Sequence, residues 1–206
     1  RELAKKILKN PENINIAISK PAEGLTQKAY MAYDNQKVQL TREILRNKQK
    51  TLSHVLIFAS SIKSVKEITK TLNKSGMKAS QMHSGLNQEQ RDKTIRDFKN
   101  KNIRILVATD ILSRGIDIKG IELVINYEVP HDAEDYIHRI GRTARADKTG
   151  EAITFINAKQ VKKFMNIEKL IGKKVQKIAL PKNFEKAPEY KIQKKKQKWR
   201  NFKKKV

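Results

Sequence analysis

The sequence predicts an α/β fold in which a doubly wound parallel β-sheet carries helices on both faces and a basic tail follows at the C-terminus. Short apolar segments alternate along the chain with amphipathic segments of about 10–15 residues, which is the pattern of βαβ units. Several apolar segments, such as Val55–Phe58, are continuous rather than alternating. Continuous apolar strands are covered on both faces, as they are in parallel sheets.

The same pattern places the individual elements. We expect strands at residues 25–33, 55–58, 79–83, 103–108, 123–127 and 152–156. We expect helices at residues 36–46, 61–75, 87–98, 133–145 and 159–171. Asn87 and Gln90 form a weak capping pattern at the start of one helix, and Gly76 ends another.

Small, polar or charged residues follow the apolar segments. They are Ala59-Ser60-Ser61, His83-Ser84-Gly85, Thr109-Asp110 and the loop 114–117. Ligands of open parallel sheets bind beyond the carboxyl ends of the strands. We therefore expect a continuous site along this edge of the sheet.

The charge of the chain indicates a polyanionic partner. Its 206 residues include 46 Lys and Arg against 21 Asp and Glu, a formal net charge of +25. Residues 182–206 hold 11 basic and 2 acidic residues, so the rest of the chain is basic in its own right. An excess of this size most often serves nucleic-acid binding.

The basic tail surrounds Trp199 and Phe202 with Lys and Arg. Basic residues interleaved with aromatic ones suit loose binding of nucleic acid, because phosphates are neutralised and bases stack on the rings. The alternative is a disordered tail that only keeps the chain in solution.

Composition also argues against several classes of protein. Without cysteine the chain has neither a disulfide framework nor a Cys-based zinc site, and we predict no metal site. No apolar run approaches the roughly 18–20 residues that span a bilayer. The first ten residues look like a charged helix rather than a signal peptide. We expect a cytoplasmic protein without a membrane partner.

The octamer at residues 138–145 concentrates three arginines and one histidine. In a helix His138, Arg142 and Arg145 would share one face. Arginine suits phosphate because its planar fork matches the phosphate oxygens and stays charged. Taken alone, such an octamer is more typical of a basic surface helix than of a phosphate site.

From about residue 25 to residue 159 the sequence resembles the second RecA-like domain of DEAD-box RNA helicases. Four segments carry the resemblance: residues 55–61 (motif IV), 83–91 with a Gln-x-x-Arg, 107–117 (motif V) and 138–145 (motif VI). Their order and spacing make the resemblance specific. The linker and the basic tail resemble bacterial members of the RhlE type.

The resemblance implies an ATP site. Arg142 and Arg145 match the family's arginine fingers, which contact the γ-phosphate and are catalytic. Asp117 matches the acid that holds the ribose. Gly115 matches the glycine at which the backbone comes close to the nucleotide. Arg114 matches a residue that supports the phosphate or contacts the partner domain. Each residue also has a purely structural alternative. Arg142 and Arg145 could form ion pairs, Asp117 could cap a helix or turn, Gly115 could be an ordinary turn glycine, and Arg114 could be a surface arginine.

The resemblance also implies contacts with the RNA backbone and with a second domain. The matching RNA-binding positions are Ser61, Gly85, Gln88, Arg91 and Thr109. His138 and Arg139 match residues that couple this domain to the first RecA-like domain. Arg91 has a helix salt bridge as its alternative, and His138 a core hydrogen bond. Ala144 replaces a glycine common in motif VI, and we expect its methyl group to favour helix slightly.

Two motifs needed for ATP hydrolysis do not occur. The chain has no Gly-x-x-x-x-Gly-Lys-Ser/Thr phosphate loop and no Asp-Glu-Ala-Asp. In the family both belong to the N-terminal RecA-like domain, which also holds Mg²⁺. We expect residues 1–23 to be the end of that domain and a linker, residues 24–180 the helicase C-terminal RecA-like domain, and residues 181–206 a disordered RNA-binding tail.

The favoured function is therefore the C-terminal motor domain of an ATP-dependent RNA helicase, inactive by itself. Its cofactor would be ATP, and its partners RNA and the N-terminal RecA-like domain. One alternative is a non-enzymatic RNA-binding or annealing module, which the charge supports equally. Arg142, Arg145 and Asp117 favour the enzyme, because a pure binder needs no nucleotide ligands. A DNA helicase of the same superfamily is the other alternative, since charge does not separate RNA from DNA.

Overall fold

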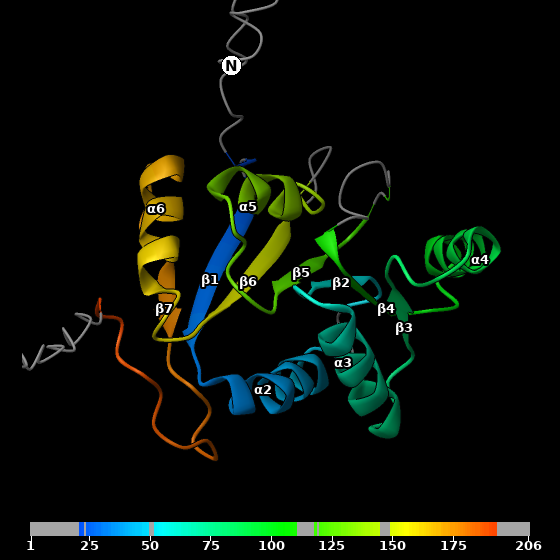
Figure 1. Ribbon diagram of the computed structural model, residues 1–206, viewed down its shortest axis with the longest axis horizontal. Coiled ribbons are helices and arrows are strands. Elements are labelled where there is room, and N and C mark those ends of the chain that lie inside the picture. The colour runs from blue at the N-terminus through cyan, green and yellow to red at the C-terminus, as the bar shows by residue number, and fades with distance from the viewer. Residues whose placement is uncertain are drawn as a thin grey trace, which may run out of the picture.

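A seven-stranded, fully parallel β-sheet forms the centre of the computed structural model, which describes residues 21–22, 24–49, 52–110, 118, 120–144 and 149–192. The strands are β1 (Leu25–Met31), β2 (Val55–Phe58), β3 (Ala79–Met82), β4 (Ile105–Ala108), β5 (Leu123–Asn126), β6 (Gly150–Ile156) and β7 (Gln176–Ile178). Their order across the sheet is β3-β4-β2-β5-β6-β1-β7 (Figure 1). The predicted parallel sheet is confirmed.

Helices cover both faces of the sheet, as predicted. They are α2 (Asp34–Asn47), α3 (Ile62–Lys74), α4 (Gln88–Lys99), α5 (Ala133–Ile140) and α6 (Val161–Ile171). Apolar residues of α2 and α3 form one core layer with Ile57, Val107 and Ile125 of the sheet. On the opposite face α5 and α6 cover β1 and β6 (Figure 1). Phe98 of α4 packs in a separate cluster with residues of β2 and β4.

Side chains begin α3 and α4 where the sequence indicates. The hydroxyl of Ser61 accepts a hydrogen bond from the Ser64 amide at 3.1 Å and caps α3. Asn87 and Gln90 cap α4 reciprocally, each side chain accepting from the other's amide. These bonds satisfy amides that have no partner inside the helix.

Helix α5 is shorter than predicted. It ends at Ile140 with Gly141 as its C-cap, whereas the sequence analysis continued it to Arg145. Thr143 leaves the helix to form a bridge with Ile121 and donates its hydroxyl to the Ile121 carbonyl oxygen. Ala144 has a φ of +52°, so its methyl group does not favour helix at this point. The predicted shared helical face of His138 and Arg142 is wrong.

The packed part of the chain continues beyond residue 180, at which the sequence analysis ends the domain. Leu180 and Phe184 pack against the core under α2 and α3. Tyr190 packs against the core under α6 and donates its hydroxyl to a Glu168 oxygen at 2.8 Å. Residues 193–206, which hold most of the basic tail, and nearly all of the predicted linker 1–23 lie outside the described residues.

Among the residues that the structure describes, no helix is long and apolar enough to cross a membrane.

Candidate functional site

The polar exits of β3, β4 and β2 lie side by side at the carboxyl edge of the sheet. β4 pairs with both neighbours, and the pairing continues past the strand ends. The Thr109 amide donates to the Met82 carbonyl at 3.1 Å, and the Ala59 amide to the Ala108 carbonyl at 2.9 Å. The predicted RNA-binding residues Ser61, Gly85, Gln88, Arg91 and Thr109 all belong to these exits or to the first turns of the helices that follow.

The turn after β3 is held by hydrogen bonds from its own residues and from α4. The Leu86 amide donates to the His83 carbonyl at 3.1 Å, and the Gly85 amide donates to His83 Nδ1 at 3.2 Å. Arg91 Nη2 donates to the Ser84 carbonyl at 2.9 Å. Arg91 therefore braces this turn, and among the described residues it forms no salt bridge along α4.

Two of the predicted RNA-binding residues are exposed. Ser61 uses its hydroxyl to cap α3 and approaches Ser64 Oγ at 2.9 Å. Gln88 donates its side-chain amide to Asp92 Oδ1 at 2.9 Å on the surface of α4. Both side chains are exposed at this edge of the sheet, and both are bonded to residues of the helix that they begin.

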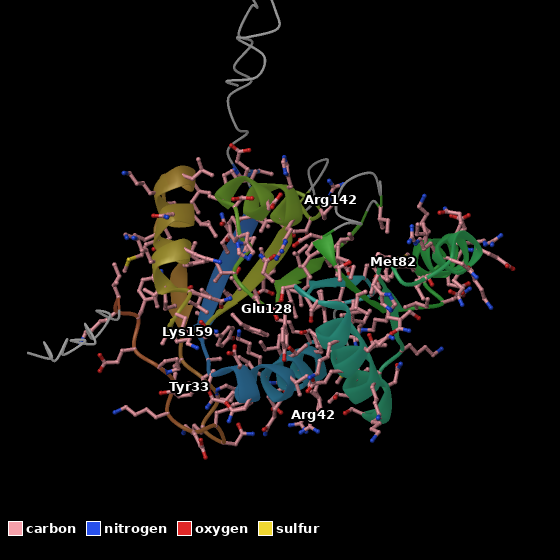
Figure 2. The ribbon with its side chains drawn as sticks, viewed as in Figure 1. Tyr33, Arg42, Met82, Glu128, Arg142 and Lys159 are labelled. Atoms are coloured by element: carbon pink, nitrogen blue, oxygen red, sulfur yellow. The ribbon has the colours of Figure 1, made fainter. Side chains whose placement is uncertain are left out.

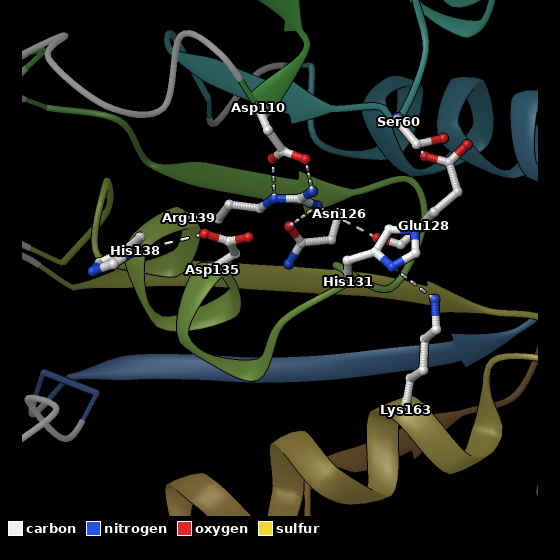
Figure 3. A network of polar contacts seen from close by, with 9 residues as sticks. All are labelled: Ser60, Asp110, Asn126, Glu128, His131, Asp135, His138, Arg139 and Lys163. Carbon is white, nitrogen blue, oxygen red and sulfur yellow. Dashed lines mark hydrogen bonds and ion pairs between the residues drawn. The ribbon is translucent and has the colours of Figure 1, made fainter. Parts of the chain in front are cut away.

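Arg139 is the centre of a buried polar network (Figure 3). Its Nε and Nη2 each donate to a different carboxylate oxygen of Asp110 at 2.6 Å, and its Nη1 donates to Asn126 Oδ1 at 3.1 Å. The guanidinium lies over the Phe58 ring at 5.2 Å, and the residue is 2% exposed. Any coupling of Arg139 to another domain must therefore act through these partners.

His138 differs from Arg139 in being exposed. Its side chain is 55% exposed and lies 4.0 Å from Asp135 on the same helix. The core hydrogen bond that was the alternative for His138 is therefore not what the structure shows. An exposed imidazole at this position is available to a docking surface.

Arg142 lies at the other end of α5, beside the amino ends of β5 and β6. Figure 2 places it far from Glu128, which follows β5 at the carboxyl edge. Arg142 lines a small cavity of about 70 Å³ together with Gly120, Ile121, Glu122, Thr143, Ala144 and Thr149. The continuous site predicted from the strand exits does not include Arg142, which lies apart from that edge because α5 runs back along the sheet before Arg142 follows it.

Gly150 determines how closely the segment after Arg142 approaches β6. A Cβ atom at Gly150 would lie 2.7 Å from the Ala144 amide nitrogen and would also collide with the Thr143 hydroxyl. Sequence reasoning missed this residue, because one glycine at the start of a strand gives no pattern.

We expect Gly150→Ala to displace the segment that holds Arg142. Backbone rather than a flexible side chain opposes the new methyl group, so the free energy of unfolding should fall by about 1–3 kcal/mol. Urea denaturation measures this loss. Gly120→Ala is a useful contrast, because no atom of the described residues lies within 4 Å of a Cβ at Gly120, whereas its φ is +81°. Any loss in Gly120→Ala would come from backbone strain, which does not apply to Gly150 because its φ is not positive. An unchanged stability of Gly150→Ala would therefore contradict the packing argument.

Four predicted ATP-site residues cannot be placed. Arg114, Gly115, Asp117 and Arg145 lie outside the described residues.

Burial and positive neighbours lower the pKa of His83, with burial the larger cause and Lys66 and Arg91 the smaller ones. The unfolded chain then takes up a proton near the ordinary pKa of about 6.5, while the folded chain does so only at lower pH. The stability that neutral His83 contributes is complete above about pH 6.5 and is lost as the pH falls below it.

We expect the unfolding temperature to fall more steeply between about pH 7 and pH 5.5 in the parent chain than in His83→Asn. Thermal unfolding followed by circular dichroism measures both slopes. Three partly or fully buried carboxylates do not titrate in this pH window. Burial raises the pKa of each, but their hydrogen bonds lower it further, so the pKa values of Glu122, Glu151 and Glu168 lie below the ordinary value for glutamate. Identical slopes in the two proteins would contradict the prediction.

Comparison with known proteins identifies the family. The chain matches the helicase conserved C-terminal domain over residues 36–147. It is a DEAD-box helicase C-terminal domain. The ATP-dependent RNA helicase DbpA of Bacillus subtilis is 35% identical over 197 residues, which cover 92% of this chain and 40% of DbpA. A DEAD-box RNA helicase of Helicobacter pylori, RhpA, is 34% identical over 182 residues, 88% of this chain and 37% of RhpA.

Solved structures agree with the sequence matches. A DEAD-box protein of Methanococcus jannaschii has a TM-score of 0.67 and 38% identity, covering 86% of this chain and 47% of that one. Dbp5 of S. cerevisiae bound to RNA and ADP BeF3 has a TM-score of 0.76 and 28% identity, covering 86% of this chain and 48% of Dbp5. The helicase C-terminal domain thus spans less than half of these longer relatives. The RhlE subtype stays a prediction.

Proposed function

We propose that this domain is the C-terminal half of an ATP-dependent RNA helicase motor. It would present Arg142 to ATP and the exits of β3, β4 and β2 to the RNA backbone. The observation that carries the proposal is the fixed place of Arg142, which follows Gly141, the C-cap of α5, and precedes Thr143, which is bridged to Ile121 before β5. An arginine held in this way is ready to meet a phosphate.

The two proposed surfaces have different chemistry. At the carboxyl edge, hydroxyl and amide groups are combined with Arg91, a mixture that binds phosphates and sugars without reading sequence. At the other end of α5, Arg142 would neutralise charge on the phosphoryl group being transferred. Arg145, Arg114, Gly115 and Asp117 complete the proposed ATP site by their resemblance to the family motifs.

The remaining parts would come from an N-terminal RecA-like domain. ATP in such motors is bound with Mg²⁺, and no group of three or more His, Asp or Glu residues among the described residues is placed to hold a metal ion. We propose that the preceding domain supplies the magnesium ligands and the phosphate loop. Residues 193–206 would add sequence-independent affinity for RNA, and the compartment we propose is the cytoplasm.

ATP turnover tests the proposal. The 206-residue chain alone should hydrolyse no ATP above background, with or without RNA. The same chain joined to an N-terminal RecA-like domain of a DEAD-box relative should hydrolyse ATP, and single-stranded RNA should stimulate it more than DNA of the same sequence. Turnover by the chain alone, or a joined protein that ignores RNA, would overturn the proposal.

A further inference from the structure

Three buried side-chain atoms at the carboxyl ends of β3 and β4 have no hydrogen-bond partner among the described residues. They are His83 Nε2, Arg91 Nε and Thr109 Oγ1. Buried polar atoms without a partner are few in native proteins, and each one requires an explanation. Their concentration at the proposed RNA surface indicates a ligand that supplies the missing partner.

His83 and Thr109 face the same side of the sheet. Met82 and Ala108 are paired across β3 and β4, and the Thr109 amide donates to the Met82 carbonyl at 3.1 Å. His83 and Thr109 are the next pair of this parallel ladder, so their side chains leave the sheet in the same direction. Only 3% of His83 and 7% of Thr109 is exposed.

The hydrogen bond to Gly85 determines the tautomer of His83. Because the Gly85 amide donates to Nδ1 at 3.2 Å, Nδ1 carries no proton and a neutral ring must carry it on Nε2. Burial and the charges of Lys66 on α3 and Arg91 on α4 lower the pKa of His83, which keeps the ring neutral. Nε2 is therefore a buried donor that lacks an acceptor in the described part of the chain.

The missing partner must be a hydrogen-bond acceptor. His83 Nε2–H and Arg91 Nε–H are donors only, and the Thr109 hydroxyl can donate as well. The positive charges of Lys66 and Arg91 favour an acceptor with negative charge. Phosphate and ribose oxygens of a nucleic-acid backbone have this chemistry, whereas base edges would require a mixture of donors and acceptors.

We propose that His83 is an RNA-binding residue of this domain, its Nε2–H donating to a backbone oxygen of the RNA that the Thr109 hydroxyl also contacts. This inference rests on the proposed function, and it adds a residue to which no role had been assigned. The atoms have almost no exposed surface, so binding requires a small movement of the side chains that cover them. Through Nδ1 the same ring holds the Gly85 turn in place.

Two substitutions separate these two roles of the ring. His83→Asn keeps an acceptor near the position of Nδ1, so the Gly85 turn is retained, but it has no atom that reaches the position of Nε2. Thr109→Val removes the hydroxyl and keeps the shape of the side chain. Each should weaken binding of a fluorescein-labelled oligouridine RNA about fivefold in fluorescence anisotropy, the loss expected for one hydrogen bond. The double variant should lose less than the product, because both groups contact one oxygen.

His54 provides the matched control. It is buried at 5% exposure, but its Nε2 already has a partner in the Phe98 carbonyl at 2.9 Å, and it precedes β2 at the opposite edge. His54→Asn should bind the oligonucleotide within twofold of the parent chain. Oligodeoxyuridine identifies the acceptor: equal losses on RNA and DNA indicate a phosphate oxygen, and a loss on RNA alone indicates the 2′-hydroxyl.

The outcomes distinguish this inference from the proposed function. Parent-like affinity of His83→Asn, with Thr109→Val and Arg91→Ala weakened, would overturn the role of His83 and leave the RNA surface in place. Parent-like affinity of all three variants would remove the RNA surface itself. If a variant fails to fold, nitrogen NMR of the histidine side chains in the parent chain tests the inference instead. Nε2 of His83 should be protonated and should shift on adding RNA, and an unchanged resonance at saturation would overturn the inference.

Discussion

Arg142→Ala is expected to lower the RNA-stimulated ATP turnover of the joined two-domain protein by about 10³–10⁵-fold, the range measured for arginine fingers. The guanidinium would act on charge that develops as the phosphoryl group is transferred, so kcat should fall far more than the affinity for ATP. Arg142 follows α5 and is half-buried at the rim of a small cavity, so its removal empties no core position. The unfolding temperature should therefore change little.

Arg46→Ala is the matched control for Arg142→Ala. Arg46 is an arginine near the end of α2 that forms a 2.9 Å surface ion pair with Glu43 and is 65% exposed. Surface pairs of this kind contribute about 0–1 kcal/mol, and the control should hydrolyse ATP like the parent. RNA affinity measured without ATP should be unchanged in both variants. A kcat for Arg142→Ala within tenfold of the parent would mean that Arg142 is not the catalytic arginine.

The sequence predicted the strands and caps well because their signals are local. The four apolar residues of β2 match the observed strand completely, and the capping pair Asn87 and Gln90 begins α4 where it was expected. β7 was missed because its residues Gln176–Ile178 are few, partly exposed and at the edge of the sheet. Such a strand forms by pairing with β1, and its three residues are too few to show a hydrophobic period in the sequence.

At the site, the sequence predicted which strand exits lie together better than it predicted the course of the chain after α5. Motif spacing brought Thr109, Gly85 and Arg91 to one edge, because consecutive parallel strands end there. The end of α5 was mistaken because helix periodicity continues through Arg142, while the Thr143 bond to Ile121 is a tertiary contact that no window of sequence contains. The burial of Arg139 is likewise a consequence of the fold, since a run of charges ordinarily indicates an exposed face.

Asp110→Ala is expected to lower the free energy of unfolding by about 3 kcal/mol, because it leaves a buried guanidinium without its counter-charge. Arg139 is 3% exposed at its side chain, and both of its short hydrogen bonds to Asp110 are 2.6 Å long. Arg139→Met should cost less, about 2 kcal/mol, because the Asp110 side chain is 44% exposed and water can hydrate it once the arginine is gone. Urea denaturation measures both losses.

The double variant Asp110→Ala with Arg139→Met decides whether the pair acts as a unit. The methionine removes the charge that Asp110 compensated, so the double variant should be no less stable than Asp110→Ala alone, and the two losses should fail to add. The Arg46–Glu43 pair on α2, treated in the same way, should show a coupling below about 1 kcal/mol. Additive losses at Asp110 and Arg139 would mean that the ion pair does not join the exit of β4 to α5. A coupled pair is a direct physical link between Thr109, the residue before Asp110, and Arg142, which follows Arg139 by one turn of chain.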